Sequence, residues 1–127
     1  MEWIVELDER ERFIRATQWD EFSLEEQARF LSDIFTSSYW RPGFGVLIDY
    51  RGLKVAGLEG GDLTAIVTIL QSIRKRIDSS RIALLCDSDV LFELGKEFSM
   101  ILAPKLANTV VVFRDEPTAI DWLTAKK

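Results

Sequence analysis

The feature that most constrains the fold is a set of short apolar runs, which lie within residues 45–52, 82–86 and 109–113. Continuous apolar runs of this length are typical of parallel strands that are covered on both faces. Apolar residues with helical spacing lie between them, at residues 63–77 and 91–102. Parallel strands need a crossover connection, so this alternation predicts strand–helix units with right-handed crossovers.

The N-terminal third of the chain adds a hairpin and a helix. Residues 3–8 and 12–17 alternate apolar and polar side chains, which predicts two antiparallel strands joined by a longer turn. Trp19 and Phe22 would then bridge to a helix, whose start is indicated by the capping box of Ser23 and Glu26. Pro117 fits the first turn of a last short helix.

Together these elements predict an α/β fold. We expect one domain over residues 1–127. Its mixed sheet would have about five strands, an N-terminal hairpin followed by strand–helix units, and would be flanked by about four helices. Asp62 is the predicted N-cap of the helix after the central strand, and Pro104 is expected to end or closely follow the helix at 91–102.

Composition excludes several classes of function. With 16 Lys+Arg against 21 Asp+Glu the net charge is -5, so nucleic acid is not an expected partner. The basic triplet at 74–76 is interpreted as complementing a helix C-terminus. The chain has no His and one Cys, which removes His-dependent triads, disulfides and most zinc sites. We therefore expect a non-catalytic protein without a metal ion or cofactor.

No apolar run approaches the roughly 18 residues that span a bilayer. Residues 1–3 lead directly into a strand pattern, without the features of a signal peptide. The sequence therefore predicts a cytoplasmic protein with no stable membrane insertion.

The candidate site follows the buried part of the central strand. Polar residues stand there, and the glycine-rich segment 57–62 then leads into the next helix. Ligands of open α/β sheets bind in the crevice beyond the carboxyl ends of the strands. A phosphate cradle is disfavoured because the known glycine motifs are absent and Asp62 would repel phosphate. We predict binding roles for Asp49, Arg51, Gly60, Gly61, Asp62 and Thr64, with Asp49 tied through Arg51 or backbone N–H groups.

Two pairs of segments carry a family resemblance. WRPG at 40–43 precedes VLIDYRG at 46–52, and VFRD at 112–115 precedes AIDWL at 119–123. In order and spacing they resemble the STAS group, the domain of anti-sigma-factor antagonists and sulfate-transporter tails, and within it stand-alone proteins related to stage II sporulation protein AA. That resemblance implies regulation through protein contact. Regulatory STAS domains are phosphorylated in a motif near Asp-Ser-Ser-Gly, where this chain has GGDLT at 60–64 and Thr64 as the nearby hydroxyl.

Two functions from different classes remain open. The leading hypothesis is a non-catalytic regulatory or protein-binding module of the STAS-like type, with an unidentified protein partner and with homodimer formation left open. The alternative is a small carrier of an apolar ligand or lipid, which the related Sec14-type fold implies. In that case the loop at 53–58 and the helix at 91–102 would cover a cavity. Trp19 and Trp40 are candidate partner contacts as well as candidate core residues.

Overall fold

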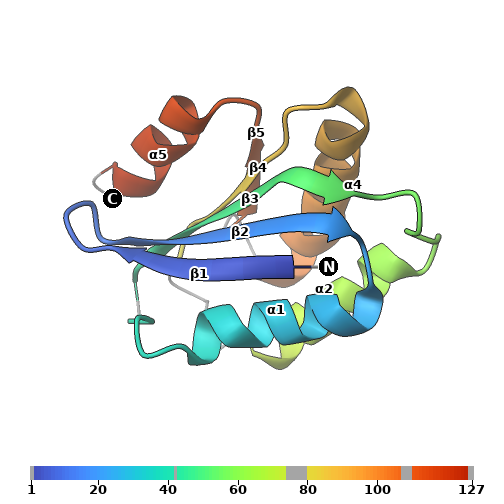
Figure 1. Cartoon of the computed structure of the whole chain (residues 1–127), viewed down its shortest axis with the longest axis horizontal. Helices are drawn as coiled ribbons and strands as arrows, with labels where there is room; N and C mark the ends of the chain where they lie inside the picture. The colour runs from blue at the N-terminus through green and yellow to red at the C-terminus, as the bar shows by residue number, and fades with distance from the viewer. Residues whose placement is uncertain (1, 42, 74–79, 107–109, 126–127) are drawn as a thin grey trace.

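In the computed structural model, which describes residues 2–41, 43–73, 80–106 and 110–125, a mixed sheet carries helices on both faces (Figure 1). The strands lie in the sheet in the order β1-β2-β3-β4-β5, with β1 antiparallel to β2 and the other neighbours parallel. This confirms the predicted five-stranded α/β fold. Along the chain the elements are β1 (Glu2–Asp8), β2 (Phe13–Glu21), α1 (Leu24–Thr36), β3 (Gly45–Lys54), α2 (Asp62–Ser72), β4 (Ile82–Leu85), α4 (Asp89–Leu106), β5 (Val110–Phe113) and α5 (Glu116–Thr124).

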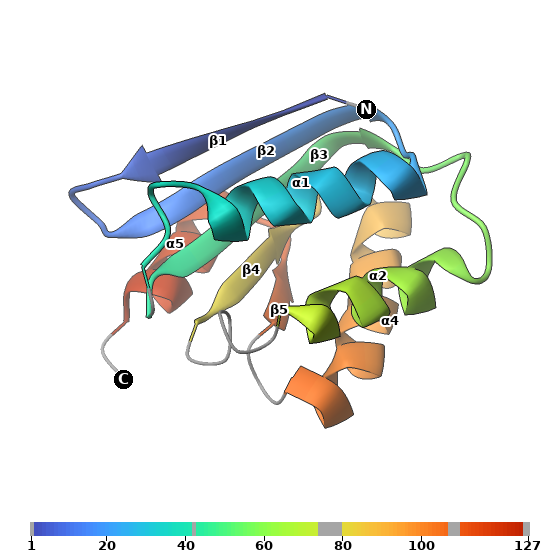
Figure 2. The same ribbon diagram turned by 90° about the horizontal axis from the view of Figure 1, so that it is seen from below.

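The two faces of the sheet have separate cores. Helices α1, α2 and α4 cover one face, and α5 lies on the other (Figures 1 and 2). Alternate residues of β3 therefore enter different cores: Val46 and Ile48 pack with α1 and α2, whereas Leu47 packs with Ala119 and Leu123 of α5. This two-sided burial explains why the central strands read as unbroken apolar runs.

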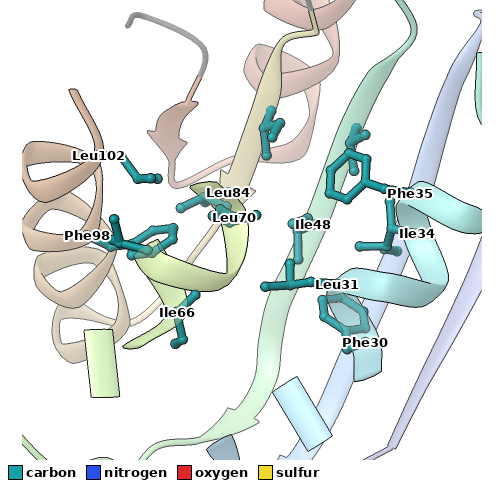
Figure 3. Packing of buried hydrophobic residues seen from close by; sticks show 14 of the residues in the cluster. Phe30, Leu31, Ile34, Phe35, Ile48, Ile66, Leu70, Leu84, Phe98 and Leu102 are labelled. Atoms are coloured by element: carbon teal, nitrogen blue, oxygen red, sulfur yellow. The ribbon is translucent and has the colours of Figure 1, made fainter. Parts of the chain in front are cut away.

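The larger core lies between the sheet and its three helices. Each helix contributes one apolar stripe, and the stripes meet over β3 and β4 (Figure 3). Residues labelled there are Phe30, Leu31, Ile34 and Phe35 of α1, Ile66 and Leu70 of α2, Phe98 and Leu102 of α4, and Ile48 and Leu84 of the sheet. The helix stripes predicted from sequence spacing are thus the buried faces.

Two strands run further than the sequence pattern indicated. β2 continues to Glu21, so Trp19 lies inside a strand and does not bridge to α1. β3 continues to Lys54, which takes up the first two residues of the expected loop at 53–58. These extensions pair with each other beyond the core, with Glu21 opposite Lys54. Backbone hydrogen bonds hold these strand ends together, so their sequences do not need the alternation of apolar and polar side chains from which a strand is predicted.

Helix ends also differ in part from expectation. The hydroxyl of Ser23 accepts from the Glu26 N–H at 3.4 Å, which confirms the predicted cap of α1. Gly61, and not Asp62, is the N-cap of α2, because the Asp62 carboxylate instead accepts from the Glu59 N–H at 2.7 Å. Helix α4 continues past Pro104 to Leu106, so the proline does not end the helix as expected.

Some expectations fall on residues that the structure does not describe. They are Pro42 of the predicted turn, the basic triplet at 74–76, and Ile77, which the apolar spacing had assigned to the second helix. Thr109, the expected first residue of the last strand, also lies outside the described residues.

Candidate functional site

Asp49 and Arg51 form an ion pair on β3. Asp49 is only 7 % exposed. Its carboxylate accepts hydrogen bonds from the Arg51 guanidinium at 2.8 and 3.0 Å and from the Arg51 backbone N–H at 3.0 Å. Burial opposes the charge of Asp49, but the hydrogen bonds and charge of Arg51 outweigh it and lower the pKa of the carboxyl. The predicted tie between these residues is therefore present, and it keeps Asp49 ionised.

The pair extends to α5 through Glu116. The Glu116 carboxylate accepts from Arg15 of β2 at 2.7 Å and from Arg51 at 3.3 Å. Asp49, Arg51, Glu116 and Arg15 thus form a charge-balanced cluster, the α5 cluster, which joins β2, β3 and the first turn of α5. Its geometry suits the docking of α5 to the sheet, because both carboxylates already have cationic partners.

The remaining predicted residues lie on the other face of the sheet. Gly60, Gly61, Asp62 and Thr64 surround the start of α2, which packs with α1 and α4, whereas Asp49 and Arg51 face α5. Thr64 is exposed. The structure therefore does not bring the six residues into one site, and a binding role for them stays a prediction about two separate surfaces.

An apolar pocket lies on the face covered by α1, α2 and α4. Its volume is about 60 Å³. The segment after β3 and helix α4 both contribute to its wall, as expected for the carrier alternative. Among the described lining residues none is charged. They are Phe22, Gln27, Tyr50, Leu53, Val55, Leu58, Leu63, Ile66, Leu84, Cys86, Leu91, Leu94, Gly95 and Phe98.

A chain of buried polar side chains reaches this pocket. Gln18 Nε2 of β2 donates to Gln27 Oε1 of α1 at 2.7 Å, and Gln27 Nε2 donates to the Tyr50 hydroxyl of β3 at 3.2 Å. Burial raises the pKa of Tyr50 well above its ordinary value, so the hydroxyl is neutral. These hydrogen bonds were not predicted from the sequence. Their one sequence signal is Gln27, a polar residue within the apolar stripe of α1 between Leu24 and Leu31.

Cys86 also lines the pocket, as a buried thiol. Burial first, and then the charges of Asp87 and Asp49, raise its pKa to about 12. A neutral thiol is a poor nucleophile, so the contribution of Cys86 here is apolar surface. Within the part of the chain that the structure describes, no group of three or more His, Cys, Asp or Glu is placed to hold a metal ion.

Two large apolar side chains stand exposed on the hairpin. Trp19 is 41 % exposed and Ile4 is 48 % exposed. Trp40, the other tryptophan considered as a partner contact, is half-buried. It packs edge-on against Phe35, with 5.0 Å between the ring centroids. No helix among the described residues is long and apolar enough to cross a bilayer.

Comparison with known proteins identifies the fold. No protein-family model matches the chain, and no curated protein matches its sequence. A solved structure, described as an uncharacterized protein from the DUF3478 family with a SpoIIAA-like fold, from Shewanella loihica PV-4, is similar. It superposes with a TM-score of 0.62 at 16% identity, over 96% of this chain and 92% of that chain. At this identity the likeness is one of fold, and it supports the resemblance to the STAS group at that level.

Proposed function

We propose that this chain, with its SpoIIAA-like fold, is a non-catalytic binding module whose ligand is a small apolar molecule held in the pocket beneath the 53–58 segment. One observation carries the proposal. An uncharged apolar pocket opens between that segment and α4, with Leu53, Leu58, Leu91 and Phe98 in its wall. Apolar walls with few polar groups are typical of small-molecule sites. We further propose a single domain over residues 1–127, acting in the cytoplasm.

The size of the pocket limits how it binds. Its volume of about 60 Å³ is well below the roughly 150 Å³ that holds benzene, and below the roughly 300 Å³ of the smallest drug-sized sites. A ligand must therefore widen it. A second cavity of about 10 Å³ shares Tyr50, Ile66, Leu84 and Phe98 with the pocket, so that rotamer changes in these shared walls would join the two spaces.

Native mass spectrometry of freshly purified protein tests the proposal. A bound mass of a few hundred daltons would support it, and a clean apo mass would count against it. Leu58→Trp would fill the pocket and should remove the bound mass. Its matched control is Glu59→Trp, which introduces the same side chain at the exposed neighbouring position and should retain the bound mass.

A second candidate is a regulatory module that binds a protein through its hairpin. The observation that favours it is the exposure of Trp19 and Ile4, since tryptophan is enriched among the residues that dominate binding energy at interfaces. Glu2 stands opposite Trp19 in the hairpin, and Thr17 stands opposite Ile4, so both apolar residues lie in a polar setting. The α2 surface at Gly60, Gly61, Asp62 and Thr64 is a separate candidate contact.

A pull-down with two sets of variants distinguishes these surfaces. Trp19→Ala should abolish capture of a partner if the hairpin is the interface, whereas Thr64→Ala and Asp62→Ala should do so if the start of α2 is. Trp122→Phe, which changes a tryptophan in the α5 core, controls for general effects of tryptophan loss. Capture that survives all three interface substitutions, together with turnover of any substrate, would contradict the protein-binding module.

A further inference from the structure

The Tyr50 hydroxyl is a polar group in the wall of the pocket whose own proton is not used in a hydrogen bond among the described residues. Its oxygen accepts from Gln27 Nε2 at 3.2 Å, and among the described residues no acceptor receives its proton. The tyrosine is half-buried and lines the pocket together with Gln27. Burying a hydroxyl proton without an acceptor costs free energy, because the proton gives up its hydrogen bond to water. A ligand that supplies an acceptor removes this cost and so binds more tightly.

The buried chain sets the direction of this hydrogen bond. Gln18 donates to Gln27, and Gln27 donates to Tyr50, so each donor in turn strengthens the next. The Tyr50 proton is then left to point away from Gln27. If both amides were reversed, Tyr50 would donate to Gln27 and would have only an oxygen to offer a ligand. The two arrangements therefore select opposite kinds of ligand.

We infer that the pocket selects apolar molecules with one uncharged hydrogen-bond acceptor, such as a ketone or ester oxygen, which receives the Tyr50 hydroxyl proton. An anionic head group is disfavoured because none of the described lining residues is a cation to pair with it. Most of the wall is aliphatic or aromatic, so the rest of the ligand is hydrocarbon. This inference rests on the proposed ligand-binding function, and it adds the chemistry that the ligand carries.

A pair of isosteric probes tests the inference. Cyclopentanone carries a carbonyl oxygen where methylenecyclopentane carries a CH₂ group, and the two are otherwise alike in shape. NMR titration of the whole chain should give cyclopentanone the lower Kd, by about three- to tenfold, which is the effect of one net hydrogen bond. Tyr50→Phe should abolish or reverse the preference for cyclopentanone, because its buried carbonyl oxygen would then lack a donor, and it should not weaken the binding of methylenecyclopentane.

A matched variant and three outcomes make the test decisive. Tyr39→Phe makes the same change at an exposed tyrosine and should leave the ratio unchanged. Equal affinities in the wild-type protein overturn the inference but not the ligand-binding function, and they indicate that Tyr50 donates to Gln27. A ratio that persists in Tyr50→Phe also overturns it. If neither probe shifts resonances of the pocket, the ligand-binding function fails and the inference fails with it.

Discussion

Replacing Asp49 with Asn keeps the shape of the side chain and removes the charge that Arg51 contacts. The backbone N–H of Arg51, 3.0 Å from Asp49 Oδ1, would keep an acceptor in the amide oxygen. The two hydrogen bonds from the guanidinium, at 2.8 and 3.0 Å, would lose their ionic partner. The variant therefore isolates the charge-assisted part of the α5 cluster.

The expected loss follows from how far each partner is buried. Removing one partner of a fully buried ion pair costs about 3–5 kcal/mol, and a hydrogen bond to a charged group contributes about 1.5–3 kcal/mol. The Arg51 side chain is 41 % exposed and keeps Glu116 at 3.3 Å, so water and Glu116 compensate for part of the loss. We expect Asp49→Asn to lower the free energy of unfolding by about 2 kcal/mol at pH 7.

The pH dependence gives a second, independent check. Because Arg51 lowers the pKa of Asp49 in the folded state, the contribution of the carboxylate is fully present above the unfolded-state value of about 3.9. It is lost as the pH falls through the lower folded-state pKa. Asparagine does not titrate. The wild-type protein and Asp49→Asn should therefore differ in free energy of unfolding by a constant amount from about pH 7 to pH 5, and this difference should become smaller below about pH 4.

Urea unfolding followed by tryptophan fluorescence measures both quantities. Asp121→Asn, which removes an exposed carboxylate from α5, is the matched control and should change the free energy of unfolding by less than about 0.5 kcal/mol. A difference for Asp49→Asn no larger than that of the control would refute the reasoning. So would a difference that does not narrow at low pH.

Two further predictions concern the wall of the pocket. Gly95→Ala should lower the free energy of unfolding by about 2 kcal/mol in urea, because the added Cβ would stand 2.8 Å from Val112 Cγ2. Gly60→Ala, where nothing lies within 4 Å, is its control, and equal losses for the two would contradict the packing argument. The Cys86 thiol, with its pKa raised to about 12, should resist iodoacetamide in the folded protein at about pH 8 and react only after unfolding in urea. Mass spectrometry reads the alkylation directly, and prompt labelling of the native protein would show that the thiol is accessible.

The fold was predictable where burial leaves a pattern in the sequence. β3, β4 and β5 are covered on both faces, and this leaves the apolar runs from which they were predicted. The ends of β2 and β3 left no such trace, because they are held by backbone pairing between polar residues. Aspartate is a common N-cap residue, but the Asp62 carboxylate accepts a hydrogen bond from the Glu59 N–H in the preceding turn. The sequence alone does not show which of these two roles an aspartate takes.

The site was predictable only where its residues are close in the sequence. Asp49 and Arg51 are two apart on one strand, so they share a face, and their pairing could be expected. Glu116 contacts Arg15 across 101 positions, and no local pattern announces that contact. The same holds for the meeting of Gln18, Gln27 and Tyr50, which depends on where α1 crosses the sheet.

The order of the strands has a consequence for how the molecule is made. Since β1 to β5 occupy the sheet in the order of synthesis, each new strand adds to an edge that is already exposed, and none has to insert between two others. A chain emerging from the ribosome can therefore build the sheet from one side to the other. Glu116 emerges after all five strands, and its contact with Arg15 ties the last helix back to the hairpin that was made first.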